Sequence, residues 1–260
     1  MSDYWEIENA LDPKALEFQK AYIRKLVDTV NDFDNIYLEI ANENYYSREW
    51  ELHLCDFIKE SEKSLPKRHL TMPRDLLSHS DVVQEWDPVM VHAGMLAKRG
   101  LKQPLIFDTD WIINPNDDEV RKAMWSAVLS GGHFSYMDDS LPFCIPPGKD
   151  KRPELHKQID YLAAFVKHIN PWEMPPDDGL VRSGRAFAMA SGTTLAAYLP
   201  NGVAVTLDLA TIAGALSARW YDPREGVFRE AVQLQGGGPL ELKPPDDQDW
   251  ALLIQKRAEK

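Results

Sequence analysis

Two apolar, strand-like stretches of this sequence each end in carboxylate side chains. The stretch NIYLEIANENYY ends its apolar run at Asn42-Glu43, and the stretch PLIFDTD ends in Asp108 and Asp110. A carboxyl group beside apolar strands can have a raised pKa and stay protonated, as a general acid requires. The alternative for each is a solvated strand-end or loop carboxylate, because Asp and Glu are usually exposed.

Alternation along the strands groups these acidic residues by face. Side chains two positions apart lie on the same face, so Glu39 shares the face of Glu43, and Asp108 shares the face of Asp110. If the first of these faces points inward, Glu39 is buried and must be paired with polar groups. We interpret Glu39 as such a structural partner and not as a catalyst.

The first part of the chain alternates between helix and strand patterns as far as about residue 170. Helices are expected within residues 13–30, 47–65, 88–100, 116–132 and 154–169, and strands within residues 36–41, 69–72, 81–84, 104–110 and 133–138. Strands that alternate with helices are typical of parallel βαβ units. A full eight-stranded barrel takes about 250 residues, so this region is too short for one.

A second region follows a linker, which the composition of NPWEMPPDDG (170–179) predicts. Five short strand patterns come next, separated by Gly, Asn-Gly and Asp-Pro turns: RAFAMAS, TLAAYLP, VAVTLDL, LSARWYDP and DWALLIQK. This spacing predicts a small antiparallel β-sandwich of roughly 80 residues. We therefore expect two domains, residues 1–172 and residues 173–260.

The composition excludes several classes of protein. The 260 residues carry 29 basic and 41 acidic side chains, a net charge of −12. No basic patch stands out, so we expect no nucleic-acid and no membrane partner. The histidines, Cys55 and Cys144 lack metal or redox spacing, and no nucleotide fingerprint occurs. We therefore predict no metal, no cofactor and two reduced cysteines.

The N-terminus does not have the pattern of a secretion signal. It lacks a basic segment and an apolar core, and no run approaches the ~18 apolar residues of a membrane span. The chain as given is expected to be cytoplasmic, or secreted or periplasmic if an upstream leader is missing.

Three sets of motifs together resemble one group of carbohydrate-active enzymes. The stretch from VDTVNDFDNIYLEIANENYY to KRHLTM resembles the strand-four region of clan-A glycoside hydrolase barrels. QPLIFDTDWI and GGHFSYMDD resemble strands seven and eight of bacterial cellulase-like, apiosidase-like proteins, and WYDPREG with PPDDQDW resembles the sandwich domain that follows them, often labelled collagen-binding. The resemblance implies an α/β fold: a partial (β/α) TIM-type barrel of about five strands, equivalent to strands four to eight, and then the antiparallel β-sandwich.

The same resemblance implies roles for the carboxylates. The acid/base of such barrels follows an Asn at the end of strand four, which here is Glu43 after Asn42, and the Asn is expected to bind a sugar hydroxyl. The nucleophile comes from the end of strand seven, where many relatives have Glu and this chain has Asp108-Thr109-Asp110. We prefer Asp110 because it lies closer to the rim, with Asp108 as the alternative. A shorter Asp widens the gap between the carboxyls, which shifts the chemistry toward inversion, and loop capping is expected for at least one of the two.

Other side chains near strand ends are candidates for substrate binding. Aromatic rings can stack on the apolar faces of pyranoses, and Asp138, followed by Asp139, ends the eighth predicted strand. The candidates besides Asn42 are Tyr45, Tyr46, Trp86, Trp111, Tyr136 and Asp138. Core or loop packing is the alternative for each.

The sequence supports two hypotheses of function. In the first, the protein is glycoside hydrolase-like and cleaves glycosidic bonds of a poly- or oligosaccharide with two carboxylates. In the second, it is a non-catalytic carbohydrate-binding or scaffold protein, a truncated relative. A half-barrel exposes a sheet edge, so a homo-oligomer or a partner chain is expected to complete the barrel.

Overall fold

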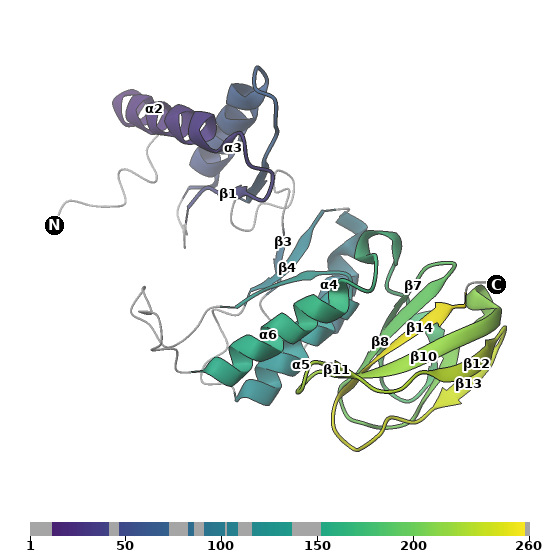
Figure 1. The fold of residues 1–260 in the computed structure, drawn as a ribbon. Coiled ribbons are helices and arrows are strands. Elements are labelled where there is room, and N and C mark those ends of the chain that lie inside the picture. Colours follow the sequence, from purple (N-terminus) through teal and green to yellow (C-terminus); the bar gives the residue numbers. More distant parts are fainter. Residues whose placement is uncertain are drawn as a thin grey trace. The chain divides into compact units, whose positions relative to one another are not determined.

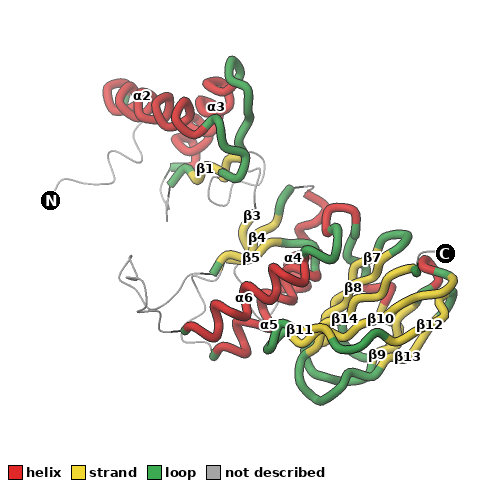
Figure 2. The backbone as a smooth tube through the Cα atoms, in the orientation of Figure 1, coloured by secondary structure: helices red, strands yellow, loops and turns green. Residues whose placement is uncertain are grey.

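The computed structural model describes residues 12–41, 47–72, 83–85, 91–101, 103–108, 116–136 and 152–257 (Figures 1 and 2). The chain divides into two compact units. The first contains residues 1–84 and 101–104, and the second contains residues 85–100 and 105–260. No helix in the described ranges is long and apolar enough to span a membrane.

The described residues of the first unit form two helices and two short parallel strands: α2 (Pro13–Val30), β1 (Tyr37–Glu39), α3 (Arg48–Glu62) and β2 (Leu70–Met72). Asp12 caps α2 by accepting from the amides of Lys14 and Ala15. Ser47 caps α3 by accepting from the amide of Trp50. Each cap satisfies amides that the first turn of a helix leaves without backbone partners.

The core of the first unit lies between the two helices and one face of β1. Its buried residues are Ile23, Val27, Leu38, Trp50, Leu54 and Ile58. In β1, Leu38 is buried, whereas its neighbours Tyr37 and Glu39 are exposed. Glu39 was expected to be buried only if its face pointed inward, and the inward face carries Leu38 because the helices pack there.

A buried His–Glu pair fastens the chain after α3. His69 Nδ1 contacts the Glu62 carboxylate, which also accepts from the His69 amide at 2.9 Å, and His69 Nε2 lies 2.9 Å from the Phe33 carbonyl. The side chains of His69 and Glu62 are only 2% and 1% exposed. Burial by itself lowers the pKa of His69, but the hydrogen bonds with Glu62 and Phe33 outweigh it and raise the pKa above its ordinary value.

The raised pKa of His69 predicts a pH-dependent stability. The interaction of protonated His69 with Glu62 stabilises the fold fully below the pKa of an unfolded histidine, about 6.5. That contribution is lost as the pH rises through the higher folded pKa. NMR titration of His69 should give the raised value, and urea unfolding should show the accompanying fall in stability. The fall should be absent in His69→Gln, and an equal pH dependence in both proteins would contradict the prediction.

The second unit begins with an α/β segment. Its elements, with β3 at the boundary between the units, are β3 (Val83–Glu85), α4 (Val91–Lys98), the 3-10 helix η1 (Arg99–Leu101), β4 (Leu105–Asp108), α5 (Asp117–Leu129), β5 (His133–Ser135) and α6 (Pro153–Val166). The sheet order is β3-β4-β5, and β4 and β5 are parallel. All five predicted strands are present in the described residues. Within the described residues they form two sheets, because no ladder joins β2 to β3.

The rest of the second unit is a sandwich-like pair of antiparallel sheets (Figure 1). The larger sheet has the order β11-β10-β14-β8-β7, with β12 also paired to β10, and the smaller has the order β13-β9-β6. The strands are β6 (Val181–Ser183), β7 (Phe187–Ala190), β8 (Thr194–Leu199), β9 (Val205–Asp208), β10 (Gly214–Asp222), β11 (Val227–Phe228), β12 (Val232–Gly236), β13 (Pro239–Leu242) and β14 (Trp250–Lys256). Three 3-10 helices, η2 (Pro171–Glu173), η3 (Asp178–Leu180) and η4 (Ala210–Ile212), lie in the connections.

The five predicted strands of this region correspond to β7, β8, β9, β10 and β14. The sequence did not predict β6, β11, β12 and β13. These strands are two to five residues long, and β12 is mostly exposed. β6 and β11 are too short to show the alternation that marks a strand in a sequence, whereas VQLQ of β12 and LEL of β13 do alternate and carry a weak signal.

The larger sheet is buried on both faces. In β14, Leu252 and Ile254 belong to the core shared with the smaller sheet, whereas Ala251 and Leu253 belong to the core shared with α5 and α6. Figure 2 shows these helices beside the strands. In α5, the ring centroid of Trp125 lies 5.5 Å from that of Tyr198 of β8. Two covered faces explain why TLAAYL and WALLI are continuous apolar runs instead of alternating ones.

The turn between β8 and β9 depends on a glycine, which gives a second prediction. Gly202 has φ +59°, and a Cβ there would lie 2.3 Å from the backbone carbon of Asp247. An alanine at this position would adopt a left-handed conformation and displace backbone, which together cost about 2–4 kcal/mol. Gly192, before β8, would place its Cβ in open space. Urea unfolding should show a large loss of unfolding free energy for Gly202→Ala and little change for Gly192→Ala. Similar losses in both variants would contradict this explanation of the turn.

Candidate active site

Most of the predicted site residues lie outside the described residues. They are Asn42, Glu43, Tyr45, Tyr46, Trp86, Asp110, Trp111, Asp138 and Asp139. Their roles in catalysis and substrate binding stay predictions. The structure describes the strands that lead to several of them, together with Tyr136 and the backbone of Asp108.

The strands before the two predicted carboxylates are both members of parallel pairs. In the first unit, β1 pairs with β2, and the amide of Ile40 donates to the Met72 carbonyl at 3.3 Å, so pairing continues to within two residues of Asn42. In the second unit, Asp108 is the last residue of β4 and pairs in register with Ser135 of β5. Parallel strands bring their carboxyl ends to the same edge of a sheet, where α/β enzymes bind substrates.

Tyr136 follows β5 directly and is held by its neighbours. Its hydroxyl accepts from Arg152 Nη1 at 2.9 Å, and its ring lies nearly parallel to Phe134 with centroids 6.4 Å apart. Arg152 also donates to Asp117 at 2.8 and 2.5 Å, which neutralises its charge. The sequence carries no signal for Arg152, which stands before the first residue of α6 and has no motif around it.

The start of α5 is set by local chemistry after the segment that contains Asp110. Asn116 accepts from the amide of Glu119 at 2.9 Å, and the Glu119 carboxylate accepts from the amide of Asn116 at 3.1 Å. This reciprocal capping box fixes the residue at which the helix begins. It therefore also fixes the end of the segment that joins β4 to α5.

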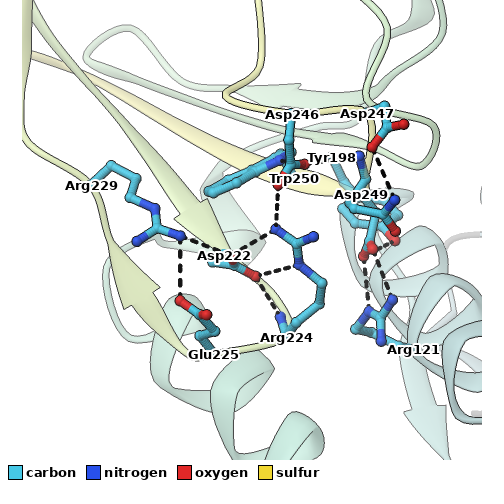
Figure 3. Close-up of polar contacts among 11 residues, drawn as sticks. Arg121, Tyr198, Asp222, Arg224, Glu225, Arg229, Asp246, Asp247, Asp249 and Trp250 are labelled. Atoms are coloured by element: carbon cyan, nitrogen blue, oxygen red, sulfur yellow. Dashed lines mark hydrogen bonds and ion pairs between the residues drawn. The ribbon is translucent and has the colours of Figure 1, made fainter.

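A buried ion pair ties α5 to the larger sheet of the sandwich (Figure 3). Arg121 is 2% exposed and donates to both oxygens of Asp249, with Nε 3.0 Å and Nη2 2.8 Å away. The Tyr198 hydroxyl donates to the same carboxylate at 2.9 Å. Burial, with help from Asp249, raises the pKa of Tyr198 well above its ordinary value, so Tyr198 acts here as a hydrogen-bond donor.

A second polar cluster explains the motif WYDPR with PPDDQDW (Figure 3). Asp222 is 1% exposed and accepts from Arg224 at 2.7 Å through both Nε and Nη2, and from Arg229 at 3.1 Å. Asp246 accepts from Trp250 Nε1 at 2.6 Å and from Arg224 at 3.2 Å. Both guanidinium groups lie near the Trp250 ring, 5.1 and 5.2 Å from its centroid. These motif residues contact one another, so the motif builds the domain.

His92, Ser130 and Asp178 form a Ser-His-Asp arrangement that does not suit nucleophilic catalysis. His92 Nδ1 lies 2.5 Å from Ser130 Oγ, and Nε2 lies 2.8 Å from Asp178 Oδ1. The Ser130 side chain is buried and its hydroxyl donates to the Ser126 carbonyl, while the His92 ring stacks on Phe187 at 4.2 Å. A nucleophile has to reach its substrate, so we interpret the three residues as a clamp that joins α4, α5 and η3.

Cys55 is a buried free thiol, as predicted, and burial raises its pKa to about 12. A thiol with this pKa is inert as a nucleophile and as a metal ligand. Within the described ranges, no group of three or more His, Cys, Asp and Glu side chains could hold a metal ion. Cys144 lies outside the described residues.

The buried ion pair between α5 and the sheet gives a third prediction. Asp249→Asn removes the buried carboxylate that pairs with Arg121 and leaves the exposed Asp118, 2.6 Å from Arg121 Nη1, as its remaining ion-pair partner. Breaking a buried ion pair on one side costs about 3–5 kcal/mol. Urea unfolding should show this loss, and the exposed control Asp247→Asn should unfold like the wild type. The double variant Arg121→Met/Asp249→Leu should recover much of the loss because no buried charge remains. A double variant as unstable as Asp249→Asn would contradict this explanation.

Comparisons with known proteins match the C-terminal part of the chain in sequence and nearly the whole chain in structure. Residues 177–255 match the family described as "Putative collagen-binding domain of a collagenase", and they lie inside the predicted second domain. No curated protein matches the chain in sequence. Among solved structures, a glycoside hydrolase shares 18% identity with a TM-score of 0.70, over 94% of this chain and 70% of the other.

Two further structures extend this likeness. A glycoside hydrolase family 5 protein from Bacteroides vulgatus is 20% identical with a TM-score of 0.71, over 94% of this chain and 66% of its own. A noncanonic maltogenic alpha-amylase, AmyB from Thermotoga neapolitana, is 12% identical with a TM-score of 0.56, again over 94% and 66%. Identities this low bear on the fold alone. The chain has a glycoside-hydrolase-like fold, and its residues 177–255 match the collagen-binding domain family.

Proposed function

We propose that the α/β part of this chain is a partial (β/α) barrel that carries a pair of catalytic carboxylates for glycoside hydrolysis. One observation carries the proposal. The carboxyl end of β1 leads to Asn42-Glu43, and the carboxyl end of β4 is Asp108, two residues before Asp110. In barrels of parallel strands, catalytic residues come from these strand ends. The glycoside-hydrolase-like fold supports the reaction class.

In the proposed mechanism, Glu43 protonates the oxygen of the leaving group as the sugar ring develops positive charge. Asp110, or Asp108 in its place, then either attacks the anomeric carbon or activates a water that attacks it. A separation of about 5–5.5 Å between the carboxyls leads to retention, and about 6.5–9.5 Å leads to inversion. Because Asp is shorter than Glu, we favour the wider gap.

The substrate in this proposal is a poly- or oligosaccharide. Asn42 would donate to a sugar hydroxyl, and Tyr45, Tyr46, Trp86 and Trp111 would supply apolar rings for pyranose faces. Asp138 would add a hydrogen-bond acceptor. Tyr136 contributes through its edge, since Arg152 and Phe134 already contact its hydroxyl and its face.

A second candidate function is that of a non-catalytic carbohydrate-binding or scaffold protein. It is supported by large apolar side chains that lie exposed in the α/β part: Phe18 at 69%, Tyr22 at 68% and Trp172 at 82%. Side chains of this kind are usually buried or used in contacts with other molecules. The two candidates differ in whether Glu43 transfers a proton to the leaving group of a substrate.

The fourth prediction tests the acid role of Glu43. Glu43→Gln keeps the shape of the side chain but removes its acid group, so the hydrolysis rate should fall about 10²–10⁴-fold. The measurement is hydrolysis of aryl glycosides and plant polysaccharides by the full chain. Glu17→Gln, at an exposed position of α2, is the matched control and should retain full activity.

Two outcomes would count against the acid role. Equal activity of Glu43→Gln and the wild type would exclude Glu43 as the acid. A wild type that binds the polysaccharides without cleaving any of them would favour the scaffold function. Asp110→Asn and Asp108→Asn, with exposed Asp56→Asn as their control, would identify the second carboxylate.

A further inference from the structure

The second unit has an open apolar groove beside its last parallel strand. The groove has a volume of about 510 Å³ and is formed by α5, β5, α6 and the start of η2. Phe134, Ile159 and Val166 contribute apolar walls, and Trp172, which is 82% exposed, stands at its border. Of the lining residues, His133 is the one with an ionisable side chain.

The strand next to this groove is at the edge of its sheet. β5 pairs with β4 on one side, and the described residues provide no strand on the other side. Its free edge presents backbone donors and acceptors that another strand can pair with. The groove and the edge therefore offer an apolar surface and a row of hydrogen-bonding groups together, which is what a strand followed by a helix requires.

The first unit has a similar exposed surface at its own end of the α/β part. Phe18 and Tyr22 are one helical turn apart on α2 and are both more than two thirds exposed. In its two-stranded sheet, β1 pairs with β2 and with no other strand of the described residues. The first and the last described βα elements thus both have an uncovered apolar face.

The number of strands needed to complete the barrel follows from the barrel geometry that we propose above. An eight-stranded barrel needs eight parallel strands, and the described residues supply five, β1 to β5, which leaves 8 − 5 = 3. The structures with the same fold contain chain with no counterpart here, because this chain covers only 70% and 66% of them. Both considerations call for additional βα units.

We propose that the groove formed by α5, β5 and α6 is the docking surface for a βα unit of a polypeptide that is not part of these 260 residues. Its strand pairs in parallel with the free edge of β5, and the apolar face of its helix covers Phe134, Val166 and Trp172. This proposal rests on the barrel in the proposed function, but not on the catalytic carboxylates.

Two other occupants fit the groove less well. A sugar needs several convergent polar groups, and the side chains of the lining offer only the His133 ring and the indole N–H of Trp172 beside backbone atoms. A second copy of this chain would bring five strands where three are missing. Each copy also has a net charge of −12, so the two copies would repel each other. A βα polypeptide can bury the apolar wall under its helix and pair its strand with the edge of β5.

The test uses residue-specific oxidation by hydroxyl radicals in the full chain and in a fusion. The fusion adds, before residue 12, the part of the Bacteroides vulgatus glycoside hydrolase that this chain does not match. Trp172 is the reporter, and buried Trp125 and Trp250 are internal references. In the unfused chain Trp172 should be oxidised rapidly, and in the fusion its oxidation should fall to the level of Trp125.

A matched pair on α6 tests the position of the docking surface. Ala163 and Ala164 are both exposed, but only Ala163 lines the groove. In the fusion, Ala163→Glu should restore rapid oxidation of Trp172, and Ala164→Glu should not. Both variants should unfold like the wild type when unfused.

Three results would overturn the proposal. The added segment stays unfolded by circular dichroism, it folds without protecting Trp172, or the unfused chain forms a dimer in sedimentation that protects Trp172 by itself. None of these measurements depends on hydrolysis. Loss of activity in Glu43→Gln and protection of Trp172 can therefore succeed or fail separately.

Discussion

The second unit depends on covering both faces of one antiparallel sheet. The strands β8 and β14 are apolar on both sides, so the smaller sheet alone cannot remove them from water. Helices α5 and α6 cover the other face, with Trp125 and Phe165 packed in the same cluster as Tyr198 and Tyr221. At about 25 cal/mol per Å² of buried apolar surface, a face of this kind stabilises the fold strongly. The α/β segment of the unit and its sandwich-like sheets therefore share a core.

This shared core gives the C-terminal domain a structural role. The matched family carries a collagen-binding label, but here one sheet face and the polar motif make contacts within the chain. Arg121 reaches from α5 into the sheet to meet Asp249, and Asp222 is surrounded by Arg224 and Arg229. Buried charges are tolerated only when they are paired and hydrogen-bonded. The geometry of the Arg121–Asp249 pair thus limits how α5 can lie on the sheet, and α5 begins directly after the segment that contains Asp110.

Parallel strands place a different demand on the chain. They bring their carboxyl ends together, which is useful for a catalytic pair, but each sheet needs covered faces and paired edges. The described residues satisfy this on the helix side, where Leu38 and Phe107 are buried. On the other side Tyr37 and Leu70 are 44% and 42% exposed, and within the described residues β5 pairs with β4 alone. The same architecture that supports hydrolysis in the proposed function also creates the demand for additional βα units.

Much of the secondary structure could be predicted from the sequence because its signals are local. Caps such as Asp12 and Ser47, apolar spacing along α3, and the long runs of β8 and β14 act within a few residues of one another. The short strands β6 and β11 could not be predicted, because two or three residues are too few to show a period. The identity of the candidate carboxylates came from motifs, whereas their mutual geometry depends on long-range placement.

The sequence by itself determined the order of the helices and of the longer strands, the boundary signals and the candidates Glu43, Asp108 and Asp110. Only the tertiary structure decided that Glu39 lies on the exposed face of β1, that Arg121 pairs with Asp249, and that His92 and Ser130 form a clamp. The physical reason is the range of the interactions. Caps and periodicity act over a turn or a strand, whereas burial and charge pairing depend on which distant segments meet, and 128 positions separate Arg121 from Asp249.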